Sequence, residues 1–262
     1  MTRLFRSEIF KFRTTPGPWV LLIVALVLTA LGIITPFFVN VAPSHTIFTA
    51  PRTVQRMRNL VGAGYGAGIL LAPVVGVLCI TTEYRQKVLS ITLLVSPRRE
   101  QVLVAKVLAS VAWSLFLAVA GLALVAAMGI PLFITQGGTL STLLNQVGPV
   151  VPGLLGAYAL LAVFGVGVGT LLRNQVAAVI LILALTLVLE PLLVLLVHDL
   201  FHADLNWFPS RATSALAGHK DTGGDGGAGP LLSWWLGGIS LLLWGVGTAV
   251  IGYFTTFRRD VT

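Results

Sequence analysis

The side chains that most often carry out chemistry in proteins do not form a catalytic set in this sequence. The four histidines have no serine or carboxylate dyad placed with them. His198 and His202 have the i, i+4 spacing of two metal ligands on a helix, but no convincing third ligand accompanies them. The single cysteine, Cys79, lies in an apolar run and supports neither a disulfide framework nor a cysteine-based metal site. We therefore expect no enzyme activity and no metal site.

Glycines in residues 62–68 could suggest a loop that binds phosphate. The stretch contains neither G-x-x-x-x-G-K-[ST] nor G-x-G-x-x-G, and the chain has no other nucleotide-binding motif. Small residues four positions apart instead allow helices to approach closely in lipid. We predict helix-packing faces here and in residues 165–169, formed by Gly62, Gly64, Gly66, Gly68, Gly165 and Gly169.

Glu190, followed by Pro191, interrupts an otherwise apolar segment. An ionisable group inside a membrane span is a candidate functional residue by default, here a pathway or outer gate. At a rise of 1.5 Å per residue, Glu190 lies roughly 25 Å beyond Arg173, near the far edge of a hydrocarbon core about 30 Å thick. We favour a position at the outer interface. Pro191 predicts a break in the helix, followed by a re-entrant piece.

The densest run of mixed charge begins at Thr82 and ends at Lys106. As a helix, residues 83–95 place Tyr84 and Val88 on one apolar face with Ile91 and Val95. Ser96 and Pro97 then have the features of an N-cap and a first helical residue. We predict a short surface helix, a turn and a new helix that enters the bilayer after Lys106.

Two interpretations of residues 82–100, the hairpin, are open from these residues alone. Its cations could lie among anionic lipid headgroups, as in an interfacial helix. Alternatively, it docks a soluble partner, with an apolar face to bury and arginines that can form bidentate contacts. The residues that would contact such a partner are Glu83, Tyr84, Arg85, Lys87, Val88, Arg98 and Arg99.

The elements that position these residues are those of an all-α integral membrane protein. Of 262 residues, 56% are hydrophobic and only 10% are charged, whereas soluble domains have about 25% charged residues. We predict one transmembrane domain over residues 1–262, with 198–229 as an extracytoplasmic loop. Six spans are expected, at about 19–39, 60–81, 101–131, 149–172, 175–197 and 231–257.

A basic amphipathic stretch precedes the first span. Phe5, Ile9 and Phe12 gather on one side, Lys11 lies with the arginines on the other, and Glu8 falls within the apolar arc. We expect residues 1–16 to contain a helix that lies in the membrane interface.

The charge distribution orients the chain. Five of the 17 lysines and arginines fall on the side opposite the N-terminus if six spans are threaded, at positions 52, 56, 58, 211 and 220. The excess of cations on the other side predicts that both termini are cytoplasmic. Because the cations flank apolar spans and no nucleic-acid-binding motif accompanies them, we expect the net charge of +8 to reflect topology and not nucleic-acid binding.

The hairpin resembles the cytoplasmic loop between the second and third spans of ABC-2 type transporter permeases, particularly the short actinobacterial type. The resemblance is carried by Glu83-Tyr84-Arg85, Ser96-Pro97-Arg98-Arg99 and Val104-Ala105-Lys106. It implies a bacterial plasma-membrane exporter subunit whose hairpin holds a coupling helix. ATP and Mg would be bound by a partner ATPase dimer, and a second permease chain would complete the pathway. The substrate would be amphipathic, such as a drug, peptide or lipid. The alternative is a structural or assembly membrane protein with a lipid-bound hairpin.

Overall fold

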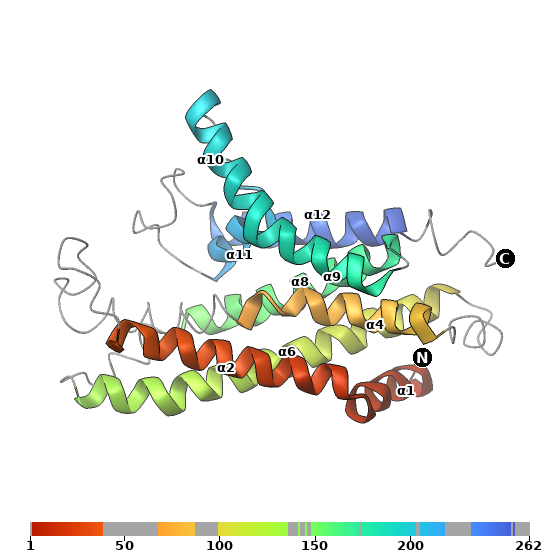
Figure 1. Cartoon of the computed structure of the whole chain (residues 1–262), viewed down its shortest axis with the longest axis horizontal. Coiled ribbons are helices and arrows are strands. Elements are labelled where there is room, and N and C mark those ends of the chain that lie inside the picture. The colour runs from red at the N-terminus through yellow and green to blue at the C-terminus, as the bar shows by residue number, and fades with distance from the viewer. Residues whose placement is uncertain are drawn as a thin grey trace.

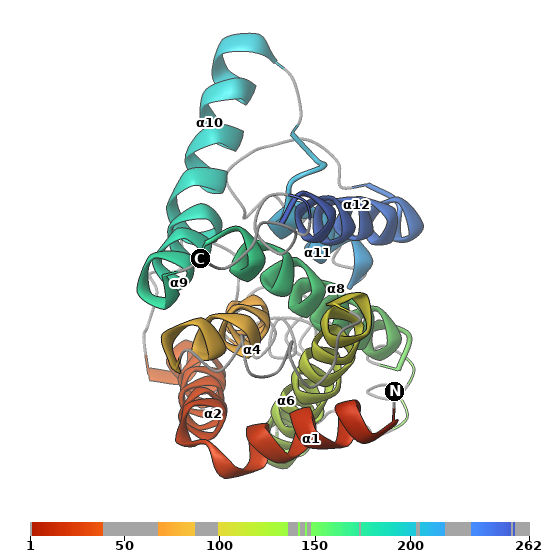
Figure 2. The ribbon, with the colours of Figure 1, turned by 90° about the vertical axis from the view of Figure 1, so that its right-hand side faces the viewer.

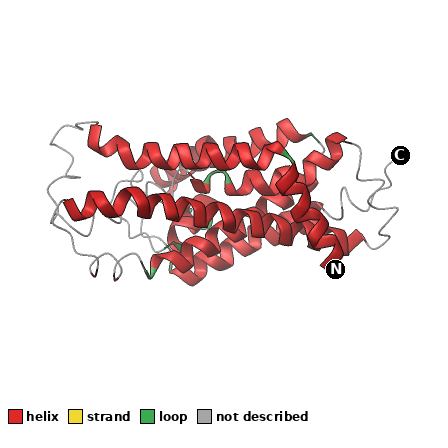
Figure 3. Ribbon diagram, turned by 90° about the horizontal axis from the view of Figure 1, so that it is seen from below, coloured by secondary structure: helices red, strands yellow, loops and turns green. Residues whose placement is uncertain are grey.

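A computed structural model describes residues 2–38, 68–86, 99–135, 141, 145, 148–172, 174–202, 205–217, 232–252 and 254. These residues are almost entirely helical and include no strand. Most of the long helices run along the long axis of the molecule (Figures 1 and 3). The helices are α1 (Thr2–Thr14), α2 (Pro16–Phe38), α4 (Ala72–Gln86), α6 (Arg99–Thr135), α8 (Val150–Leu171), α9 (Gln175–Ala184), the π-helix η1 (Leu185–Leu189), α10 (Glu190–Phe201), α11 (Pro209–Leu216) and α12 (Trp234–Gly252).

Five helical segments of the described chain are long and apolar enough to cross a membrane. They are Pro16–Ile34, Gln101–Pro131, Val150–Leu171, Gln175–Phe201 and Trp234–Gly252. This confirms an all-helical fold typical of a multi-pass membrane protein. The second expected span, 60–81, falls partly outside the described residues, and its described part is residues 68–81, which include most of α4. The number of six spans therefore remains a prediction.

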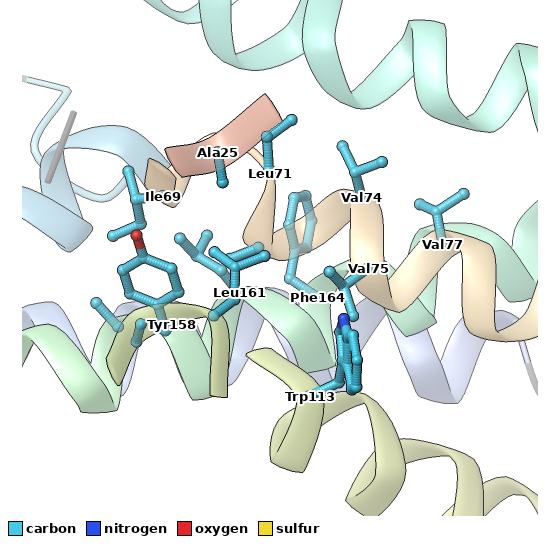
Figure 4. Packing of buried hydrophobic residues seen from close by; sticks show 14 of the residues in the cluster. Ala25, Ile69, Leu71, Val74, Val75, Val77, Trp113, Tyr158, Leu161 and Phe164 are labelled. Carbon is cyan, nitrogen blue, oxygen red and sulfur yellow. The ribbon is translucent and has the colours of Figure 1, made fainter. Parts of the chain in front are cut away.

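Helix α8 is the centre of the bundle. It packs against α4, α6 and α12. In Figure 4, Tyr158, Leu161 and Phe164 of α8 lie among Val74 and Val75 of α4, Trp113 of α6 and other core side chains. Most of the other helices expose leucine, isoleucine and valine side chains, so the outer surface of the bundle is apolar and suits lipid. The interior is closely packed, as in a soluble protein.

The helix does not break at Pro191, so that part of the sequence-based prediction is wrong. Helices α9, η1 and α10 follow one another without interruption from Gln175 to Phe201. The π-helical turn just before the proline explains this continuity, because the Glu190 N–H bonds to the Leu185 carbonyl five residues back. A wider turn accommodates a proline that an α-helical interior would otherwise reject.

The short helix α11 follows this long segment and packs against α8 and α12. Helix α10 instead projects from the bundle (Figures 1 and 2). The chain turns between them at His202, whose φ of 50° is left-handed. A short helix thus precedes the last span, as expected, although it begins well after Pro191. That this helix re-enters a membrane remains a prediction.

Candidate functional site

Four charged side chains from three helices meet at one end of the bundle, and we call Glu8, Lys11, Glu83 and Lys106 the ion cluster. The Lys11 Nζ lies 2.7 Å from a Glu8 carboxylate oxygen and 2.6 Å from Glu83 Oε1. The Lys106 Nζ lies 3.1 Å from the other Glu8 oxygen and 2.6 Å from the same Glu83 oxygen. Each ammonium therefore bridges both carboxylates, and α1, α4 and α6 are joined at this point.

The ion cluster is buried and electrically balanced. The Lys106 side chain is fully buried, and the side chains of Glu8 and Glu83 are each only 7% exposed. An unpaired charge in such a place would carry a large desolvation penalty, which two carboxylates and two ammoniums offset for each other. Only Lys11 reaches solvent, with a side chain that is 43% exposed. The cluster thus forms a polar junction with one solvated member.

Electrostatics favour the charged forms of the two members that lie outside the spans. For Glu83, burial acts to raise the pKa, but the charge and hydrogen bond of Lys106 and the hydrogen bond of Lys11 outweigh it, so the pKa is lowered. For Lys11, burial acts to lower the pKa, but hydrogen bonds to Glu8 and Glu83 outweigh it, so the pKa is raised. Both groups therefore stay ionised at neutral pH.

Aromatic packing holds α1 against α6 beside the ion cluster. Phe12 stacks on Trp113 with ring centroids 5.7 Å apart, and Trp19 meets the same ring edge-on at 5.4 Å. The turn between α1 and α2 is fixed by two hydrogen bonds. Thr15 donates to the Lys11 carbonyl at 2.7 Å, and the Trp19 indole donates to the Arg13 carbonyl at 3.1 Å. This packing places Glu8 and Lys11 over the ends of α4 and α6.

The predicted partner-contact residues differ in exposure, and some of them are not described by the structure. Glu83 is buried in the ion cluster and is not on the surface that a partner would touch. Tyr84 is half-buried, and Arg85 is exposed on the last turn of α4. Arg99 begins α6. Lys87, Val88 and Arg98 lie outside the described residues, as does most of the predicted surface helix 83–95, whose first residues continue α4.

The helix predicted within residues 1–16 is present as α1, and its apolar side faces the rest of the protein. Phe12 is buried in the core, and Phe5 and Ile9 pack against that core. The apolar side of α1 therefore packs against the protein. Lys11, which was expected on the solvated side, reaches inward to the carboxylates.

Two of the predicted packing glycines lie where α8 meets α4. A methyl group on Gly165 would lie against the Pro73 backbone, 2.6 Å from its carbonyl carbon, and one on Gly169 would lie 3.2 Å from the Val77 Cα. Gly68 lies against the Tyr158 hydroxyl, where a methyl group would approach to 2.6 Å. Gly62, Gly64 and Gly66 fall outside the described residues.

Glu190 is fully buried inside the protein, and its position at the outer membrane interface stays a prediction. One carboxylate oxygen accepts a hydrogen bond of 2.9 Å from the backbone N–H of Ser210, in the first turn of α11. This oxygen thus satisfies an N–H that α11 itself leaves without a partner. Glu190 links α10 to α11 inside the protein.

Sequence reasoning missed Glu8 and Lys106 as site residues, although both gave a signal. Glu8 lies in the apolar arc of α1, and Lys106 lies in the first turns of an apolar span. A charge on an apolar helix face predicts a buried partner. The sequence therefore indicates that each charge has a buried partner. It does not identify the partner, because Glu8 and Lys106 are 98 residues apart in the chain.

Comparison with known proteins adds no relative. No family model matches this chain, and no curated protein matches it significantly.

Proposed function

We propose that this chain is the permease subunit of an ATP-driven ABC exporter in a bacterial plasma membrane. A partner ATPase dimer supplies ATP hydrolysis and binds ATP and Mg, and a second permease chain completes the pathway. The observation that supports this function best is the ion cluster at the base of the hairpin. Glu83 near the end of α4 and Lys106 near the start of α6 are 2.6 Å apart, and both are tied to α1. The hairpin is thus anchored to a rigid junction.

The ion cluster suits the transmission of force. A displacement of the hairpin acts on the last turn of α4 and the first turn of α6. Because Lys106 cannot leave its carboxylates without exposing a buried charge to an apolar surrounding, the three helix ends move as one body. Helix α4 transmits that movement to α8 through the close contact at Gly76 and Gly165. Helices that meet through small residues can shift against each other without large side chains interlocking.

Arg85 is the described residue best placed to contact the ATPase. It is exposed, and it projects from α4 two residues beyond the buried Glu83. Arginine forms bidentate contacts with carboxylates and is common at the centres of protein interfaces. Tyr84 beside it supplies the aromatic anchor.

Co-purification tests whether the chain binds an ATPase. The tagged chain is extracted in mild detergent, as wild type and with Tyr84→Ala plus Arg85→Glu. We expect a soluble ATPase that co-purifies in stoichiometric amount with the wild type and is lost from the double variant. Arg85→Lys, which keeps the charge, should retain it in part. The absence of an ATPase from every preparation would favour a structural or assembly protein with a lipid-bound hairpin.

A transport assay tests whether the hairpin couples ATP hydrolysis to transport. Arg85→Glu plus Arg98→Glu should leave membrane insertion intact but separate ATP hydrolysis from transport in proteoliposomes. Transport that is unchanged in this double variant would contradict the proposed function.

A further inference from the structure

The outward face of α1 is basic and has one large apolar side chain at its centre. Arg6, Phe10 and Arg13 have the i, i+4, i+7 spacing that places side chains on one helix face. Phe10 is 66% exposed, and both arginines are exposed. Within the described part of the chain, neither arginine belongs to an ion pair. Two cations and an aromatic ring are therefore presented together to the surroundings.

The opposite face of α1 is already occupied by the protein. Phe12 is 5% exposed and stacks on Trp113, and Glu8 is held by Lys11 and Lys106. An interfacial helix normally turns its apolar face to lipid. Here that face is covered, so a contact with the membrane must use the basic face.

The position of α1 brings its basic face to the level of lipid headgroups. Figure 2 views the bundle from the end that holds the ion cluster, and α1 runs across this end, at a steep angle to the spans. The first candidate span begins at Pro16, one residue after the turn at Thr15. Trp19, which is 40% exposed, lies just beyond that turn, and tryptophan is enriched at membrane–water interfaces. Helix α1 therefore lies beside the entry of α2 into the bilayer.

We propose that the outer face of α1 binds anionic phospholipid headgroups, with Arg6 and Arg13 on the phosphates and Phe10 between the upper acyl chains. The guanidinium group donates two parallel hydrogen bonds to a phosphate, and this geometry favours arginine at such a site. The i, i+7 spacing sets the two arginines about 10 Å apart along the axis, enough for two neighbouring lipids. This inference stands apart from the proposed exporter function, because a non-transporting membrane protein would bind lipid in the same way.

A crosslinker at the centre of the face identifies its partner. Phe10 is replaced by a photoreactive phenylalanine analogue in the full-length chain, and membranes of the producing cells are irradiated. We expect adducts whose mass corresponds to one phospholipid, rich in phosphatidylglycerol or another anionic class. Adducts with a protein would show that an acidic protein surface covers this face, and would overturn the lipid assignment.

Charge variants measure the lipid preference. The full-length chain is reconstituted in phosphatidylcholine vesicles with and without phosphatidylglycerol, and spin-labelled lipids report relative association. Arg6→Gln plus Arg13→Gln should lower the preference for phosphatidylglycerol about tenfold at low salt. Arg6→Lys plus Arg13→Lys should keep most of it, and added salt should weaken it in the wild type.

Two controls separate this face from general charge effects. Arg85→Gln removes another exposed arginine at the same end of the bundle and should leave the preference unchanged. Thermal unfolding of each variant in detergent should match the wild type, because Arg6 and Arg13 are exposed. An equal loss of preference in Arg85→Gln, or none in the double glutamine variant, would overturn the proposal.

Discussion

Lys106 is the residue on which the ion cluster depends most, because it is fully buried and touches both carboxylates. Lys106→Met leaves Glu8 and Glu83 with Lys11 alone, so a negative charge remains uncompensated in an apolar surrounding. We expect the free energy of unfolding to fall by about 3–5 kcal/mol. Thermal or denaturant unfolding in detergent measures it.

A second variant tests whether the loss of charge balance causes the destabilisation expected for Lys106→Met. Lys106→Met combined with Glu83→Gln leaves one carboxylate with one ammonium, so the double variant should be more stable than the sum of the single effects predicts. Arg85→Met, at an exposed position, should change the unfolding free energy by about 0.5 kcal/mol or less. Additive effects of the two cluster changes would contradict a coupled cluster.

The ion cluster also predicts how stability depends on pH. The pKa of Glu83 is lowered from its usual value of 4.5, so its contribution is present above pH 4.5 and is lost as the pH falls through the folded-state pKa. The pKa of Lys11 is raised from 10.5, so its contribution is present below pH 10.5 and is lost as the pH rises through its folded-state pKa. Unfolding midpoints against pH should show a plateau between these limits, and Glu83→Gln should flatten the acid side.

At the residue scale, the sequence predicted which positions were unusual but not how they pair. Glu8 in an apolar arc, Glu190 in an apolar span and Lys106 at the start of one all stand out by composition. Their partners come from other helices or from the first turn of α11, which only the packed fold brings near. Glu83 was expected at a surface, because amphipathic periodicity cannot distinguish a face that meets a partner from one that meets α1.

Among the helices, the contact between α4 and α8 depends on close backbone approach. A methyl group on Gly76 would lie against the Ala162 carbonyl and 2.6 Å from the Val166 nitrogen, so the backbone itself would have to move. We expect Gly76→Ala and Gly165→Ala each to destabilise the protein by about 1–3 kcal/mol. Thermal unfolding of purified protein gives the comparison.

Gly121 in α6 is the matched control for these two substitutions. A methyl group there has no neighbour within 4 Å. Gly121→Ala should be neutral or should stabilise the helix by up to about 1 kcal/mol, because alanine has the better helix propensity. Equal losses at Gly121 and Gly165 would show that the close approach of α8 to α4 is not the cause of the loss at Gly165.

The link between α10 and α11 depends on one carboxylate. Glu190→Leu removes the acceptor for the Ser210 N–H, whereas Glu190→Gln keeps an amide oxygen in its place. We expect faster hydrogen exchange over Pro209–Leu216 in the leucine variant and much less change in the glutamine variant. Hydrogen exchange is measured by mass spectrometry. Equal exchange rates over this helix in the two variants would contradict a role for the Glu190 oxygen in holding α11.

The elements were more predictable than the contacts between them. Long apolar runs marked the third, fourth and last spans to within a few residues, because a helix in lipid must satisfy its own backbone. Pro191 misled the reading of the fifth span, since a proline normally ends a helix and a π-helical turn has no clear sequence signature. The same local reasoning placed the short helix α11 too early.

At the scale of the molecule, the ends of α1, α4 and α6 that carry the ion cluster lie together (Figure 1). Arg6 and Arg13 on α1 and Arg85 on the last turn of α4 are exposed. The bias of cations toward one side predicts that this end is cytoplasmic. Ser7 on α1 and Ser141 in the connection between α6 and α8 are both exposed and suit a test of this orientation.

Serine-to-cysteine changes at these two positions alter little else, and Cys79→Ala provides a background free of thiols. In intact spheroplasts, a membrane-impermeant maleimide should label Ser141→Cys at once, and should label Ser7→Cys only after the membrane is permeabilised. The wild type should remain unlabelled in both cases, because Cys79 is buried. The reverse pattern would place the ion cluster and Arg85 outside the cell, where no ATPase could reach them. Labelling of both variants in intact cells would instead contradict an odd number of membrane crossings between residues 7 and 141, and with it the six-span topology.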